Sequence, residues 1–89
     1  MNTEEKLFPN KQYYKTMLLE CVETAKKAGY RVDILEDSNC MFIFLFKDNI
    51  LCEDLYLPYD RYKPSAEKEI SRFENFVNSQ YKKALSNCN

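Results

Sequence analysis

The longest uninterrupted run of apolar residues, positions 40–46, limits the fold of this chain more than any other feature. Three of its seven residues are phenylalanine, and the run has the length of a buried strand. It is much shorter than the ~20 apolar residues that a membrane-spanning helix requires. Successive side chains of a strand point to opposite faces, so we expect both faces of this strand to be at least partly covered.

The segments around this run predict two more strands. Residues 30–34 alternate between apolar and polar side chains, as a half-buried strand does, and residues 36–39 have turn composition. After the run, Asp48 and Asn49 favour a two-residue hairpin loop because both residue types tolerate positive φ. A third strand is predicted over residues 50–57. Together the three segments predict an antiparallel meander.

Helical periodicity brackets the predicted strands. Between residues 11 and 28 apolar side chains recur at intervals of three and four, with Asn10 as the expected N-cap and Gly29 as the residue that ends the helix. A second apolar stripe begins after Ser65, the expected N-cap of another helix, and continues to Cys88. The order of elements is therefore α-β-β-β-α.

A chain of 89 residues is long enough for one domain. Two helices that lie side by side on a three-stranded meander form a two-layer domain of the α+β class. We expect this domain to span residues 11–89 and to be preceded by an N-terminal arm, residues 1–10.

Expected loop lengths determine which side chains share a face of the sheet. A two-residue loop at Asp48-Asn49 and a three-residue loop at residues 37–39 set the register of the meander. This register predicts that the helices cover the phenylalanines of the central strand and apolar residues of both neighbours: Phe42, Phe44, Phe46, Tyr30, Val32, Ile34, Leu51, Leu55 and Leu57. The opposite face, with Leu35, Met41, Ile43, Leu45 and Tyr56, is then predicted to be left open.

An apolar surface that no helix covers is a candidate docking surface. The loop that follows the third strand adds tyrosines and an arginine, residue types that are enriched at binding hot spots. The predicted partner-binding residues are therefore Leu35, Met41, Ile43, Leu45, Tyr56, Tyr59, Arg61 and Tyr62. The expected partner is a larger protein or a second copy of the chain.

Few residues suit catalysis or metal binding. The chain has no histidine, the commonest general base, and one glycine, which is too few for a phosphate-binding loop. Its four cysteines lie far apart and form no C-x-x-C pair. We therefore expect free thiols and a protein that is not an enzyme, with no catalytic residues, no metal and no cofactor.

The order α-β-β-β-α resembles that of double-stranded RNA-binding domains. Those domains carry lysines at the start of the last helix, where they contact phosphates. In this chain the corresponding stretch, residues 63–69, holds two lysines and two glutamates. Nucleic-acid binding is therefore an alternative, with Lys26, Lys27 and Arg31 as its candidate residues.

The acidic, polar start of the chain lacks the pattern of a signal peptide, so we expect a cytoplasmic protein with no membrane partner. Its abundance of Lys, Asn, Tyr, Phe and Ile is typical of AT-rich coding in low-GC bacteria and their phages. Phages encode small anti-CRISPR and other anti-defence inhibitors, and some resemble this chain in element order. The leading hypothesis is a small inhibitor or adaptor of phage or mobile-element origin, and a homodimeric structural protein is a further alternative.

Overall fold

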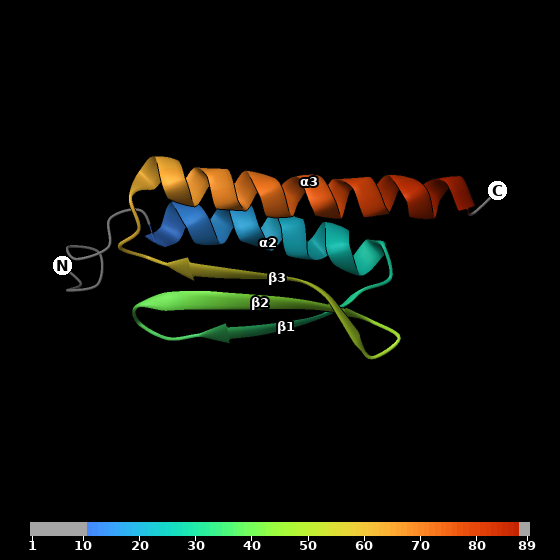
Figure 1. The fold of residues 1–89 in the computed structure, drawn as a ribbon, viewed down its shortest axis with the longest axis horizontal. Coiled ribbons are helices and arrows are strands. Elements are labelled where there is room, and N and C mark those ends of the chain that lie inside the picture. The colour runs from blue at the N-terminus through green and yellow to red at the C-terminus, as the bar shows by residue number, and fades with distance from the viewer. Residues whose placement is uncertain (1–10, 88–89) are drawn as a thin grey trace.

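A computed structural model describes residues 11–87 as two helices and a three-stranded sheet. The elements in chain order are α2 (Lys11–Lys27), β1 (Arg31–Glu36), β2 (Cys40–Lys47), β3 (Ile50–Pro58) and α3 (Lys63–Asn87). Both helices lie on the same side of the sheet, so the domain has two layers (Figure 1). The predicted α+β class and α-β-β-β-α order are confirmed. The predicted arm, the N-cap at Asn10 and Cys88 lie outside the described residues.

Helix α2 buries its predicted stripe and ends where glycine permits it. Gly29 has a φ of 95°, a conformation that costs little only for glycine. The Gly29 N–H donates to the Lys26 carbonyl (3.0 Å) and the Tyr30 N–H to the Ala25 carbonyl (3.1 Å). These two bonds form a Schellman motif, which satisfies the last carbonyls of the helix and turns the chain into β1.

The loop between β2 and β3 has the predicted length. Asp48 and Asn49 have φ values of 54° and 64°, as a type I′ turn requires, and Phe46 pairs with Leu51 as expected. One residue later the register shifts, because Leu45 pairs with Glu53. Residue 52 is thus an extra residue in β3, and this β-bulge was not predicted.

The loop between β1 and β2 is shorter than predicted. Ile34 pairs with Ile43 rather than with Phe42, and the Asp37 N–H donates to the Cys40 carbonyl (3.1 Å). The Asp37 carboxylate also accepts hydrogen bonds from the Asn39 and Cys40 amides, at 2.7 and 3.0 Å, which stabilises the tighter turn. Both pairings of β2 therefore differ by one residue from those predicted.

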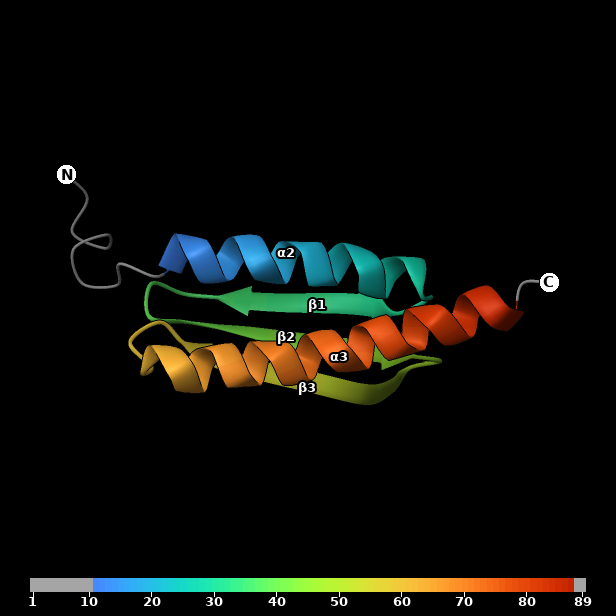
Figure 2. The same cartoon turned by 90° about the horizontal axis from the view of Figure 1, so that it is seen from above.

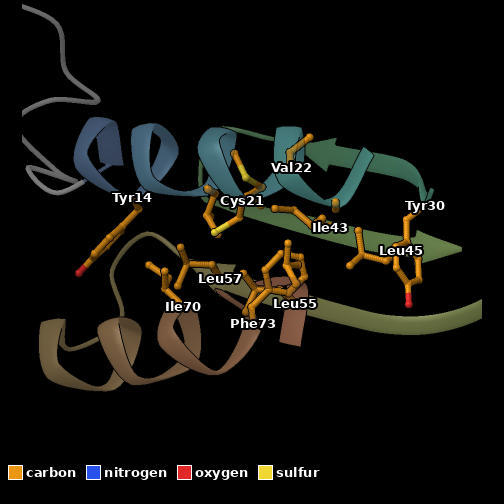
Figure 3. Close-up of a cluster of buried hydrophobic side chains, with 14 of the residues drawn as sticks. Tyr14, Cys21, Val22, Tyr30, Ile43, Leu45, Leu55, Leu57, Ile70 and Phe73 are labelled. Atoms are coloured by element: carbon orange, nitrogen blue, oxygen red, sulfur yellow. The ribbon is translucent and has the colours of Figure 1, made fainter. Parts of the chain in front are cut away.

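A shift of one residue exchanges the two faces of a strand. The helices cover the face of β2 that carries Met41, Ile43 and Leu45, all of them buried. These side chains pack with those of α2, α3 and the neighbouring strands, among them Leu55, Leu57, Ile70 and Phe73 (Figure 3). The predicted assignment of the β2 faces is wrong, whereas Val32 and Ile34 of β1 and Leu55 and Leu57 of β3 share the helix side as expected.

Candidate functional site

The sheet face that neither helix covers, here called the open face, carries apolar side chains from all three strands. Residues that pair across the sheet share a face, so the pairings arrange its side chains in three rows. The first row contains Leu35, Phe42 and Tyr56. The second contains Asp33, Phe44 and Asp54, and the third contains Arg31, Phe46 and Leu51.

Aromatic rings hold one another in place on the open face. The rings of Phe42 and Phe44 are parallel within 2°, with centroids 6.0 Å apart, and Tyr56 stacks on Phe42 at 4.5 Å. The three phenylalanines are half-buried, while Leu35 and Tyr56 remain 62% and 47% exposed. The open face thus presents ordered rings to solvent, and their ordering entropy is already lost before any partner binds.

Two arginines flank the aromatic rows. The Arg31 guanidinium lies 4.4 Å from the centroid of Phe46 and 3.6 Å from the Asp33 carboxylate. The Arg61 guanidinium lies 5.9 Å from the centroid of Tyr56 and donates to its carbonyl at 3.5 Å. Cation–π contacts of this kind are attractive and hold the guanidinium groups near the rings.

A hollow of about 320 Å³ adjoins the first row, at the end of the sheet where β1 turns into β2. It is bordered by Leu35, Glu36, Asp37, Cys40 and Phe42. Its walls are mainly apolar. A partner's apolar side chain fits such a hollow better than a polar one does.

The predicted partner-binding residues are divided between several places. Leu35 and Tyr56 lie on the open face and Arg61 at its margin, while Tyr62 is 74% exposed in the following loop. Met41, Ile43 and Leu45 are unavailable because the helices cover them. Sequence reasoning missed the residues that replace them on the open face: Phe42, Phe44, Phe46 and Leu51.

Tyr59 is also unavailable, because it belongs to a polar cluster that ties three elements together. Its hydroxyl donates to the Glu36 carboxylate at 2.8 Å, and the Lys15 ammonium lies 3.2 Å from the same carboxylate. Burial alone would raise the pKa of Glu36, but the hydrogen bonds from Tyr59 and Lys15 outweigh it and lower this pKa. Burial, followed by the bond to Glu36, raises the pKa of Tyr59. The cluster therefore holds α2, β1 and the end of β3 together.

The thiols of the described residues are free, and one of them is buried beside an acid. The Cys21 Sγ lies 3.6 Å from the Glu74 carboxylate, and burial, together with this carboxylate, raises the pKa of the thiol to about 12. A protonated thiol is a poor nucleophile. Across residues 11–87 no three Cys, Asp or Glu side chains gather into a group that could hold a metal ion.

The residues of the nucleic-acid alternative lie at the end of α2 and at the start of β1. Lys26 and Lys27 lie in the last turn of α2, in the helix layer, and Lys26 is 3.7 Å from the Glu23 carboxylate. Arg31 lies on the open face, against Phe46 and Asp33. Nucleic-acid binding through these three residues stays a prediction, since it depends on whether several cations act along one surface.

Comparisons with protein-family models, curated proteins and solved structures each find no match to this chain. Functional conclusions therefore depend on the geometry of the chain itself. Within the described part, neither helix is long and apolar enough to cross a membrane.

Proposed function

We propose that this protein acts by binding another protein through its open face, as a small adaptor or inhibitor. The proposal rests on the three half-buried phenylalanines of β2, Phe42, Phe44 and Phe46, on the side of the sheet that lacks helices. An apolar surface of this kind on a small domain is typical of a protein interaction site. Completing the burial of each ring contributes on the order of 1 kcal/mol to association.

The composition of the open face supports this role. Aromatic residues and arginine are the residue types that contribute most to binding at protein interfaces. Tyr56 and Arg61 pack against each other at the margin, and Phe42 continues this contact towards the centre. The hollow beside Leu35 supplies a place for one apolar side chain of the partner.

The charges favour a different protein over a second copy. Asp33 and Asp54 both lie opposite Phe44, one in each neighbouring strand. Two sheets that pack face to face keep their strands within about 30° of alignment. A twofold axis centred on Phe44 would then bring Asp33 close to the second copy's Asp33 or Asp54, and like charges in contact are destabilising. A partner with an apolar patch and a basic residue at its centre avoids this repulsion.

An origin in a phage or mobile element, and a role against host defence, stay predictions from composition and element order. The open face accommodates them, because an inhibitor of this size acts by covering a functional surface of a larger protein.

Affinity capture with matched variants tests the proposal. Wild-type protein and the variants Phe44→Ala and Tyr56→Ala serve as baits in lysate of the native host, followed by mass spectrometry. Leu85→Ala, at an exposed position of α3, is the matched control. We expect a partner that the wild type and the control retain and that both open-face variants lose at least about tenfold. Equal capture by all baits would reject the open face as the binding site.

A further inference from the structure

The two edges of the sheet differ in whether other groups cover their outward-facing backbone N–H and C=O groups. In an antiparallel pair, alternate residues direct their N–H and C=O groups to the partner strand and the others direct them outward. The bond from the Asp37 N–H to the Cys40 carbonyl marks a hydrogen-bonded pair of the β1–β2 ladder. Counting back along the register, the residues of β1 whose backbone groups face outward are Val32, Ile34 and Glu36.

The outer edge of β3 is protected at each of its last three outward-facing residues. The bond from the Tyr59 N–H to the Asn39 carbonyl fixes the alternation, so Asp54, Tyr56 and Pro58 face outward. Arg72 of α3 donates to the Asp54 carbonyl at 3.2 Å, and Arg61 donates to the Tyr56 carbonyl at 3.5 Å. Pro58 has no N–H to offer. Bulges, prolines and covering side chains are the usual means by which proteins prevent strand addition at an edge.

The outer edge of β1 has none of these protections. It contains no proline and no bulge, and among residues 11–87 no side chain hydrogen-bonds to the outward backbone groups of Val32 or Ile34. A groove of about 280 Å³ runs beside this edge, under α2. Its lining is apolar apart from Lys15 and Glu36 at one end, and it includes Leu18, Leu19, Val22, Ile34, Met41 and Ile43.

Two apolar side chains that line the groove remain exposed to solvent. Ile34 points to the helix side of the sheet and yet remains 42% exposed, and Leu19 of α2 is 51% exposed above it. In the core of a two-layer domain, such positions are normally covered by the next strand. An added strand would place every second side chain in this groove.

The occupant is not a second copy of the whole domain. Helix α2 lies over β1, as α3 lies over β3 (Figure 2). Antiparallel pairing of two β1 strands about a twofold axis would set them ~4.8 Å apart, with their α2 helices at a similar separation. Packed helices need about 8–10 Å between their axes. A segment that carries no helix of its own at this position meets no such obstacle.

We propose that the β1 edge binds an extended segment of a partner protein, which joins the sheet as a fourth strand. The segment has an apolar residue beside Ile34, which enters the groove, and a basic residue beside Asp33 on the open face. The charge follows from the edge itself, because an acidic residue beside Asp33 would be repelled and a basic one attracted. Arg31, 3.6 Å from Asp33 along β1, and Lys15, 3.2 Å from Glu36, are the other charged groups near this edge.

This binding mode goes beyond the proposed function, since it uses backbone groups of β1 rather than the rings of β2. Main-chain hydrogen bonds give affinity to such strand addition, and alternate side chains give it specificity. The open face and the β1 edge can therefore be tested separately.

Peptides selected from a random phage-displayed library on the immobilised protein provide the probe. Amide hydrogen exchange measured by NMR then reports where they bind. In the free protein we expect fast exchange at Val32 and Ile34 and slow exchange at Asp33 and Leu35, whose amides bond to β2. Bound peptide should slow exchange at Val32 and Ile34 by at least about tenfold, and the selected sequences should alternate apolar and polar residues with a basic one among them.

Two variants decide between this site and others. Ile34→Pro removes an outward N–H and leaves the β1–β2 ladder intact, and Asp33→Lys reverses the charge without changing the backbone. Both should lose peptide binding by at least about tenfold, while Phe44→Ala on the open face retains it. If Ile34→Pro fails to fold, as circular dichroism would show, Asp33→Lys still gives the answer. Unchanged binding by Asp33→Lys, or peptides that protect no outward amide of β1, would overturn the proposal.

Discussion

The two faces of β2 are equally apolar and yet occupy different environments. On one face Met41, Ile43 and Leu45 are buried beneath the helices, with Ile43 and Leu45 fully inaccessible. On the other face the phenylalanines at alternate positions remain half-buried and stack on one another and on Tyr56. Hydrophobicity therefore did not decide which face the helices cover.

The register of strand pairing determines which face of β2 the helices cover. Leu55 and Leu57 face the helices whether or not β3 contains a bulge, and so do Val32 and Ile34 of β1. The extra residue at position 52 and the tight turn after β1 each shift a register by one. Together they place the phenylalanines of the central strand, and Leu51 before the bulge, on the face opposite to Val32, Ile34, Leu55 and Leu57. The larger rings were left outside, where they form a surface instead of a core.

Ile43 and Phe44 allow the sharpest test of this comparison, because they are adjacent on the same strand. Ile43→Asn should cost about 5 kcal/mol, since it removes a buried side chain and leaves an unsatisfied amide in the core. A loss of this size can unfold a small domain. Phe44→Asn should leave the domain folded. Urea denaturation followed by circular dichroism measures both, and similar losses for the two variants would mean that the faces are not distinct.

Deletion of Cys52 tests whether the bulge sets the orientation of β2. Without the extra residue, β2 and β3 cannot keep both the turn at Asp48-Asn49 and the pairing of Ile43 with Leu55. We expect a loss of ~3 kcal/mol in the free energy of unfolding. Cys52→Ser keeps the chain length at an exposed position and is expected to change it by less than about 0.5 kcal/mol. A stable deletion variant would show that the bulge is dispensable.

A smaller effect is expected within the open face. Phe42→Ala removes the ring between Phe44 and Tyr56 and should cost about 1 kcal/mol, the scale of cross-strand aromatic pairs. Tyr62→Ala, at a 74% exposed loop position, serves as the reference for a ring that packs on little. If Phe42→Ala lowered the free energy of unfolding nearly as much as Ile43→Asn does, the open face would be part of the core. Thermal unfolding compares the two variants.

The smallest effect belongs to the polar cluster that joins the layers at one end. The pKa of Glu36 is lowered in the folded state, so its ionised form stabilises the fold above the ordinary glutamate pKa of about 4.3, and this contribution is lost as pH falls below it. Glu36→Gln should remove less than about 1 kcal/mol at neutral pH and flatten the decline of stability between about pH 5 and pH 3. Glu20→Gln, on the exposed side of α2, should leave that decline unchanged. Denaturation at several pH values measures the difference.

Element order and helix faces could be predicted from the sequence because their signals are local. Apolar periodicity located α2 and α3, Gly29 marked the end of α2, and Asp48-Asn49 specified the turn. Helix α3 begins at Lys63, two residues before the predicted N-cap, which is within the usual uncertainty of helix ends.

The side of β2 that the helices cover could not be predicted from the residues of β2 themselves. A strand that is apolar on both sides gives no alternation, so its orientation depends on loop lengths and bulges elsewhere. Neither Asp37, which tightens the first turn through its carboxylate, nor the bulge at residue 52 has a reliable sequence signal. The predicted faces were therefore correct for Leu35 and Tyr56, whereas the central strand and Leu51 were assigned to the wrong face.

The unequal edges of the sheet also limit how such molecules can associate. A fibre that grows by adding strands edge to edge needs two open sheet edges on every molecule. Arg72, Arg61 and Pro58 protect the last three outward-facing residues of β3, so within residues 11–87 the β1 edge is the one more open to strand addition. A domain with one open edge can accept one added strand but cannot extend a fibre. In the folded protein, strand addition through this sheet therefore ends after a single step, even at high concentration.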